Sequence, residues 1–150
     1  MEDRERLIGL VDWIAKNTNH NLNFIPDDKL DWHPAPQAKS ALDIAHEIAT
    51  SVDSIANLMK TSEYHTTIAR PTSREEAQAA ISAAAEAYIT TSRSLSEERL
   101  AEPVDFFGMD MTVDKVLELP VIEATHHHGQ IVYIQTLLGD TKDHFFQMDG

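Results

Sequence analysis

The sequence predicts an all-α protein, a four-helix bundle that forms a single domain over residues 1–150. Four long segments carry apolar residues at the three- and four-residue spacing of an amphipathic helix, and proline- or glycine-containing segments separate them. No internal repeat or low-complexity tract interrupts this pattern. A chain of 150 residues is also long enough to bury one core of its own. We therefore expect four helices packed around one core.

The first helix is expected over about residues 2–22, where apolar residues recur at the helical period. The residues that set this period are Leu7, Leu10, Val11, Ile14 and Ala15. Residues 24–39 contain three prolines, which block helical hydrogen bonds and bias the preceding residue toward extended geometry. This segment is predicted to be an ordered connection, with Leu30 and Trp32 as its apolar anchors.

The second and third helices each begin at a serine that is followed three residues later by an acidic residue. The two pairs are Ser40 with Asp43 and Ser73 with Glu76. This spacing is typical of a capping box, in which the two side chains satisfy free amides of the first helical turn. The second helix is expected to end near residue 60 and the third, which is rich in alanine, near residue 95.

The last long helix is predicted from about Thr112 to Gly139, a residue suited to the left-handed turn that ends a helix. Residues 96–111 before it are expected to form a loop or a short extended excursion. The last helix is apolar almost all round, which predicts a central position. Pro120 should kink it, unless the first turn begins there, where proline is favoured.

Composition excludes several classes of function. The formal net charge of −13 repels nucleic-acid phosphates and anionic lipid, so we expect neither a nucleic-acid nor a membrane partner. The chain has no cysteine, which excludes a disulfide framework, a thiolate metal site and a cysteine nucleophile. The charged start of the chain has no apolar run behind it like that of a signal peptide, and no segment has the length of a membrane span. We expect a cytoplasmic protein.

Two polar residues lie in the inward stripe of the last helix, namely Glu123 and His127. An unpaired buried carboxylate is costly, so these two side chains, one turn apart, should share a partner. A divalent metal ion satisfies both, and His46 on the second helix is the best third ligand. The structural alternative is a charge pair between Glu123 and a neighbouring protonated histidine.

A resemblance to a known family supports the metal interpretation. The segment from Asp43 through His46, the preceding Ile25 to Pro34 and the downstream His127-His-Gly-Gln130 resemble the DinB/YfiT-like superfamily of metal-dependent four-helix proteins. The resemblance covers nearly the whole chain. It implies that one histidine from the second helix and two ligands from the last helix hold one metal. Carried over, these positions are His46, Glu123 and His127.

The resemblance also implies an activity. Glu123 stands where the commoner family pattern has histidine, and a His, Glu, His set is similar to the branch of mycothiol-dependent maleylpyruvate isomerase. Three ligands leave coordination positions open, as in catalytic sites. The resemblance therefore implies a metal-dependent enzyme, with Zn or Ni as cofactor, that activates a low-molecular-weight thiol toward an electrophilic small-molecule substrate. It also implies a homodimer.

Other interpretations stay open at this stage. Metal-assisted hydrolysis replaces the thiol with water, and a non-catalytic metal- or ligand-binding bundle needs no turnover. A dinuclear site that combines Asp43 and His46 with Glu123 and His126 lacks clear inward carboxylates from the other two helices. His126 and His128 are expected beside the metal site or at the surface, and Gly129 is expected at a close contact with a neighbouring helix.

Overall fold

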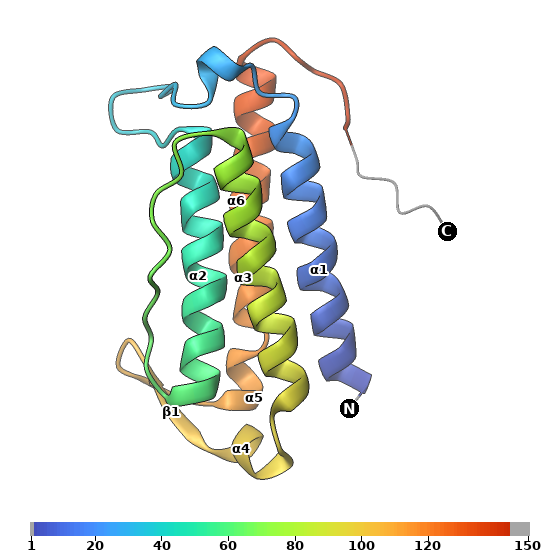
Figure 1. Cartoon of the computed structure of the whole chain (residues 1–150), viewed down its shortest axis with the longest axis vertical. Helices are drawn as coiled ribbons and strands as arrows, with labels where there is room; N and C mark the ends of the chain where they lie inside the picture. Colours follow the sequence, from blue (N-terminus) through green and yellow to red (C-terminus); the bar gives the residue numbers. More distant parts are fainter. Residues whose placement is uncertain (1, 145–150) are drawn as a thin grey trace.

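A computed structural model describes residues 2–144. Four long helices dominate it (Figure 1): α1 (Glu2–Leu22), α2 (Ala41–Thr61), α3 (Arg74–Ser94) and α6 (Leu119–Leu137). The shorter elements are the 3-10 turn η1 (Asp27–Lys29), the helices α4 (Glu97–Ala101) and α5 (Val113–Val116), and the strands β1 (Pro103–Phe106) and β2 (Met109–Thr112). The prediction of an all-α four-helix bundle is confirmed.

The long helices form a bundle in which α1 and α2 lie diagonally opposite each other. Both α1 and α2 pack against α3 and against α6. Helices α1 and α6 run in one direction and α2 and α3 in the other, because residues 62–73 return along the length of the bundle before α3 begins (Figure 1). A 21-residue helix is about 32 Å long, and twelve extended residues reach about 40 Å, so this segment is long enough for the return. The pairing of α2 with α6 is the part of this topology that builds the site.

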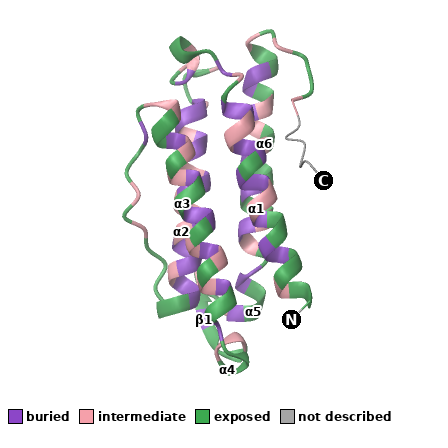
Figure 2. Cartoon of the chain, turned by 45° about the vertical axis from the view of Figure 1, so that its right-hand side comes forward, coloured by how far each residue is buried: buried purple, intermediate pink, exposed green. Residues whose placement is uncertain are grey.

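Buried side chains line the inner face of each long helix, and exposed residues cover the outside (Figure 2). Tyr88, Leu22, Ile48 and Met59 are among the largest side chains that are completely buried. In the proline-rich connection, Leu30 is buried and Trp32 packs against the core, as the sequence predicts. None of the helices in the described residues is both long and apolar enough to cross a bilayer.

The predicted helix starts are confirmed at residue level. At α2, the hydroxyl of Ser40 accepts a hydrogen bond from the amide of Asp43, and the carboxylate of Asp43 accepts one from the amide of Ser40. Together the two bonds form a complete capping box. At α3, Ser73 accepts the amide of Glu76, but the Glu76 carboxylate bonds the amide and hydroxyl of Thr72 instead. Each start therefore satisfies free amides of the first turn, by two variants of one motif.

The last helix differs from its prediction in two ways. The segment breaks into α5 and α6, and Pro120 lies in the first turn of α6, where the missing amide costs nothing. The helix is also not central, because its outer face leaves Ile122, Tyr133 and Leu137 exposed. Helix α6 therefore carries more apolar surface than its packing against the core buries. Gly139 ends the segment with a φ of +100°, as expected.

Residues 96–111 are more regular than the sequence predicts. They form α4 and a two-stranded antiparallel hairpin in which Phe106 pairs with Met109. The two turn residues, Phe107 and Gly108, have positive φ values of 53° and 81°, as a tight hairpin turn requires. The Phe107 ring is exposed and forms edge contacts with Phe106 and with Tyr64 from the α2–α3 connection.

Candidate metal site between α2 and α6

Glu123 and His127 of α6 lie side by side, one helical turn apart, as predicted. Oε2 of Glu123 is 3.5 Å from Nε2 of His127. The imidazole is buried, whereas the Glu123 side chain is half exposed, so the pair lies at the rim of the core. The spacing of the two residues on the helix therefore translates into contact between their side chains.

His46 does not join this pair. Its Nε2 lies 3.1 Å from the carbonyl oxygen of Ile68, in the extended segment between α2 and α3. Among residues 2–144, neither His46 nor Glu47 completes a group of three ligand atoms within 4.8 Å of one another with Glu123 and His127. The structure therefore separates the predicted third ligand from the other two.

Glu47 takes the place on α2 that was predicted for His46. Its Oε2 lies 3.6 Å from Nδ1 of His127. Successive residues of a helix are rotated by about 100° around its axis, so only one of the two neighbours can face α6. His127 is thus flanked by a carboxylate on each side, from Glu47 and Glu123.

The two carboxylate oxygens of Glu47 have different surroundings. Oε1 accepts a charged hydrogen bond from Nζ of Lys39, which lies just before α2. Oε2 is shielded from solvent and has no hydrogen-bond partner, since 3.6 Å to His127 is too long for a hydrogen bond. A buried carboxylate oxygen without a donor is costly, and a bound cation would remove that cost.

Gln130 fixes the orientation of the His127 ring. Oε1 of Gln130 lies 2.7 Å from Nδ1 of His127. An amide oxygen can only accept, so Nδ1 carries the proton and Nε2 keeps its lone pair on the side of Glu123. The sequence analysis assigned no role to Gln130 beyond the family motif. Its contact with the ring is the kind that orients a metal-binding histidine.

A polar cavity of about 320 Å³ opens beside these residues. It is lined by Glu47, Thr50, Ser51, Ser54, Tyr64, Thr66, Glu123 and His127, and we call it the Glu47 pocket. Burial raises the pKa of the Tyr64 phenol, a hydrogen bond with Ser54 lowers it, and the charge of Glu123 raises it further, with a net increase. Tyr64 therefore stays a neutral hydroxyl in this pocket at physiological pH.

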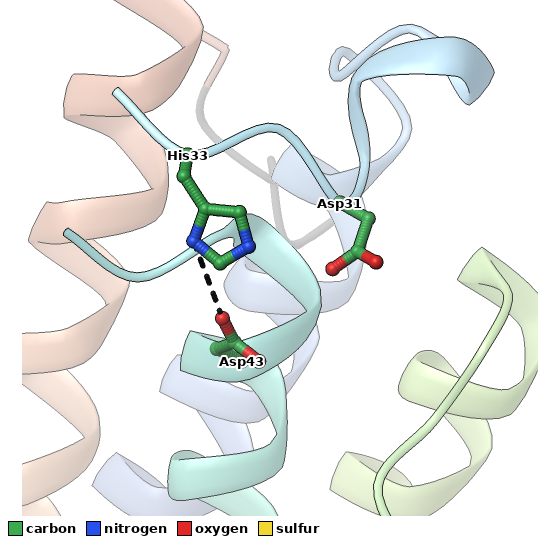
Figure 3. Close-up of side chains that lie close together, drawn as sticks. All are labelled: Asp31, His33 and Asp43. Carbon is green, nitrogen blue, oxygen red and sulfur yellow. Dashed lines mark ion pairs between the residues drawn. The ribbon is translucent and has the colours of Figure 1, made fainter. Parts of the chain in front are cut away.

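A second cluster of metal-binding groups lies at the start of α2 (Figure 3). Asp31, His33 and Asp43 have ligand atoms within 4.8 Å of one another, the only such group of three among residues 2–144, and this spacing is compatible with one ion. The His33 ring points toward Asp43, with Nδ1 3.8 Å from Oδ2 (Figure 3). No motif in the sequence pointed to this cluster.

Arg70 already supplies a cation to that cluster. Its guanidinium bonds Oδ1 of Asp31 and, at 2.7 Å, Oδ1 of Asp43. The hydrogen bond from Arg70, with another from Ser40, holds the pKa of Asp31 below its ordinary value. Burial raises the pKa of Asp43, but hydrogen bonds from Ser40 and Arg70 outweigh it and the net pKa is lowered. A metal ion would have to displace Arg70, so we interpret the cluster as a clasp between three segments.

The other histidines have separate surroundings. His126 is exposed on the outer face of α6, and His128 is half-buried with Nε2 2.8 Å from Oδ1 of Asn21. The dinuclear alternative is not assembled, because Asp43 is bound by Arg70 and His46 by Ile68. His144 stacks on Phe24 with 3.6 Å between ring centroids.

Gly129 differs from its prediction. A Cβ atom built on it meets no other atom within 4 Å, so no neighbouring helix approaches it closely. It lies instead on the exposed side of α6, in the wall of a groove.

The fold and the site together define a four-helix bundle with a carboxylate and histidine cluster between its second and last long helices. The family model described as the DinB family matches residues 1–147, and the chain belongs to the DinB family. The comparison with curated proteins gives no match.

Solved structures have the same fold at low sequence identity. A DinB-like protein from Bacillus subtilis is 23% identical with a TM-score of 0.77, and the alignment covers 97% of this chain and 99% of that one. A DinB-like protein from Bacillus cereus is 20% identical with a TM-score of 0.73, covering 90% and 92% of the two chains. A conserved protein from Enterococcus faecalis is 17% identical with a TM-score of 0.74, covering 91% and 97%. The architecture is thus that of known DinB-like proteins.

Proposed function

We propose that this protein is a metal-dependent DinB-family protein in which Glu47, Glu123 and His127 hold one divalent ion. The observation that carries the proposal is the buried, unpartnered Oε2 of Glu47, which lies 3.6 Å from Nδ1 of His127. To share an ion with Nε2 and Glu123, the Glu47 side chain has to turn toward the Nε2 side of the ring. Glu47 replaces His46 as the ligand expected from α2, because His46 is bonded to Ile68. Glu123 and His127, the two ligands expected from α6, remain in the proposed set.

The donor set favours a harder ion than the sequence analysis predicted. Two carboxylates and one imidazole supply more oxygen than nitrogen, and oxygen-rich sites suit Mn²⁺, Fe²⁺ or Mg²⁺ rather than the softer Zn²⁺ and Ni²⁺. Gln130 contributes by holding the proton on Nδ1 of His127, which leaves Nε2 free to bind a cation. Mn²⁺ is therefore the first ion to test.

The charge of the set favours water over a thiol as the reacting group. A divalent ion supplies Lewis acidity and lowers the pKa of a bound nucleophile. Glu47 and Glu123 together would neutralise its two charges, so a thiolate would make the resting centre negative, whereas a water would leave it neutral and would give up its proton to a neighbouring carboxylate only on attack. The resemblance to a thiol-dependent branch rested on a His, Glu, His set, which the position of Glu47 changes. We propose metal-assisted hydrolysis of a small molecule as the activity.

The hydroxyl groups of the Glu47 pocket support this chemistry. Ser51, Thr66 and the neutral Tyr64 lie beside the two acidic side chains and the imidazole. Ser51 and Thr66 already donate their protons to the carbonyl oxygen of Ile48 and to Asp53. Tyr64 is therefore the hydroxyl that can donate to the polar end of a substrate, while the carboxylates, which only accept, are held toward the cation. A non-catalytic metal-binding bundle has no need for such a lining.

Calorimetric titration of the metal-free full-length protein with Mn²⁺ tests the proposal. We expect one ion per chain, and at least about tenfold weaker binding in Glu47→Gln, Glu123→Gln and His127→Gln, since each removes a ligand. Hydrolysis of a nitrophenyl ester by the Mn²⁺-loaded protein, lost with chelator and restored by Mn²⁺, tests turnover. Binding of Mn²⁺ without any hydrolysis would favour the non-catalytic alternative.

Two control variants separate the candidate sites. His46→Ala should leave Mn²⁺ affinity within about threefold of the wild type, because His46 faces Ile68. Asp31→Asn should do the same, because Arg70 already pairs with that carboxylate. A loss of Mn²⁺ binding in Asp31→Asn would move the ion to the other cluster, and a loss in His46→Ala would restore the ligand set predicted from sequence.

A further inference from the structure

A groove separate from the Glu47 pocket runs along the outer face of α6. It lies between α6, the start of α2 and the segment of residues 34–39, and its volume is about 600 Å³. Its walls include Pro34, Lys39, Ile44, Gly129, Gln130 and Tyr133, and we call it the α6 groove. The volume is within the range of small-molecule sites, and Tyr133 at 63% and Leu137 at 46% exposure add apolar surface that the core does not cover.

Gly129 leaves space in this groove at a cost to the helix. A glycine inside a helix is about 1 kcal/mol less favourable than alanine. No packing contact explains it, since an added Cβ would meet no atom within 4 Å. Gly129 lies in the wall of the groove, so a side chain there would occupy the groove rather than clash with the protein. The missing side chain therefore serves the open space.

The charges of the groove differ from those of the rest of the molecule. The chain has a formal net charge of −13, yet within the described residues no Asp or Glu lines the groove. Lys39 is the one Lys or Arg in that lining, and its side chain is half exposed. The groove therefore combines mainly apolar walls with the ammonium of Lys39, which pairs with Glu47, and the imidazole of His126. This lining is complementary to an organic anion with an apolar body.

Two direct contacts connect the groove to the Glu47 pocket. Lys39 lines the groove and donates to Oε1 of Glu47. Gln130 also lines the groove and accepts from Nδ1 of His127 at 2.7 Å. The two cavities have no lining residue in common, but a ligand in the groove would touch Lys39 and Gln130, which contact the proposed metal ligands Glu47 and His127.

We propose that the α6 groove binds a small organic carboxylate with an apolar body, whose carboxylate pairs with Lys39. The apolar part lies along Tyr133 and in the space left by Gly129. This ligand draws Lys39 away from Glu47, so the carboxylate of Glu47 becomes available to a cation. The proposal that the anion binds depends only on the groove. The proposal that the anion strengthens metal binding rests on the proposed function.

Coupling between the two ligands is reciprocal by thermodynamic necessity. An anion that releases Glu47 from Lys39 raises the affinity for Mn²⁺, and Mn²⁺ raises the affinity for the anion by the same factor. The arrangement makes metal binding depend on the presence of the organic ligand. Substrate and ion would then be retained together.

Titration of the full-length protein with octanoate, followed by amide chemical shifts in NMR, tests the proposal. We expect saturable shifts in the segment of residues 34–39 and in α6. Octanamide, which has the same length and no charge, should bind about three- to tenfold more weakly, and Lys39→Met should weaken octanoate binding by a similar factor. Equal affinities of octanoate for the wild type and Lys39→Met would overturn the role of Lys39.

Gly129→Leu tests whether the groove is the binding site, and Gly9→Leu is its matched control. Both glycines lie on exposed helix surface with no atom within 4 Å of an added Cβ, but Gly9 is on α1, away from the groove. We expect at least about tenfold weaker octanoate binding in Gly129→Leu and unchanged binding in Gly9→Leu. Equal binding by both variants would overturn the proposal.

The remaining outcomes separate this inference from the proposed function. Octanoate binding without any Mn²⁺ binding would support the groove and refute the metal site. Mn²⁺ binding without octanoate binding would support the metal site and refute the groove as a binding site for the anion. If the wild type is a dimer by sedimentation and Gly129→Leu is a monomer, a second copy of the chain occupies the groove, and the small-molecule proposal is wrong.

Discussion

Oε1 of Gln130 lies 2.7 Å from Nδ1 of His127, within one turn of the same helix. The amide oxygen fixes the proton on Nδ1, so the lone pair of Nε2 faces Glu123. A side chain outside the proposed ligand set thus determines which nitrogen of His127 carries the proton. The protonation of the His127 ring depends on a neighbour three residues away.

Replacement of Gln130 by leucine should weaken Mn²⁺ binding by about 10- to 100-fold, because the imidazole loses the acceptor that orients it. Gln130 is half-buried, so the change should leave the thermal midpoint nearly unaltered. Calorimetry measures the affinity, and circular dichroism measures the midpoint. Gln130→Glu, which keeps an acceptor at this position, should retain binding. The idea fails if Gln130→Leu binds Mn²⁺ as tightly as the wild type.

Lys39→Met should raise the affinity for Mn²⁺ by about three- to tenfold at low salt. The substitution removes a positive charge that pairs with Glu47 and competes with the ion. The gain should shrink as NaCl is added, because the Lys39 side chain is half exposed and its charge is screened. Lys29→Met, on the turn before Trp32, is a matched surface control and should change nothing. Unaltered Mn²⁺ affinity in Lys39→Met would show that the ion does not use Glu47.

The helices could be predicted from the sequence because their signals are local. The Ser40 and Asp43 capping box places the start of α2 within one residue, and Pro120 offers a helix start that the structure adopts. Apolar periodicity identifies the buried faces without knowledge of their partners. These signals depend on a few neighbouring residues, so long-range packing does not alter them.

The choice between His46 and Glu47 could not be made in the same way. Both are half-buried residues at the edge of the apolar stripe of α2, and about 100° of rotation separates them. Which one faces α6 depends on how two helices distant in sequence pack, which in turn depends on the return of residues 62–73. Histidine is the commoner metal ligand, so chemistry alone favoured His46, whereas the packing brings Glu47 to His127. The hairpin, by contrast, had a local signal in Gly108 that the analysis did not use.

Arg70→Gln should lower the thermal midpoint at neutral pH by about 2–4 °C, because it removes the clasp on Asp31 and Asp43. The pKa values of both carboxyls are lowered from 3.8 in the folded protein. Their contribution to stability is therefore present above pH 3.8 and is lost as the pH falls through the lowered values. The difference between variant and wild type in scanning calorimetry should therefore hold down to about pH 4 and shrink as the pH falls further.

Arg6→Gln is the control for the clasp, since Arg6 forms an exposed pair with Asp3 at 3.8 Å within one helix. Such pairs contribute little, so this variant should unfold at the wild-type midpoint. A wild-type midpoint in Arg70→Gln as well would mean that the contacts of Arg70 with the two carboxylates do not stabilise the fold.

Tyr88 connects α3 to the break before α6, because its hydroxyl donates to the carbonyl oxygen of Leu117 at 2.8 Å. Tyr88→Phe leaves that buried acceptor without a donor and should reduce the free energy of unfolding by about 1–3 kcal/mol. Urea denaturation at pH 7 measures the loss. Tyr133→Phe, on the exposed face of α6, should have no measurable effect on stability.

Alkaline pH gives a second test of the same side chain. Burial raises the pKa of Tyr88 from 10.0 to about 12, against a lowering by the hydrogen bond with Ser92. The unfolded phenol ionises from about pH 10, while the folded one stays neutral until about pH 12. Stability from the neutral phenol is therefore fully present below pH 10 and lost as the pH rises toward 12. Tyr88→Phe has no phenol to ionise at this position and should not lose this stability at alkaline pH. The free energies of unfolding of the two proteins should therefore converge between pH 10 and 12. Parallel curves would show that the phenol of Tyr88 ionises as easily in the folded chain as in the unfolded one.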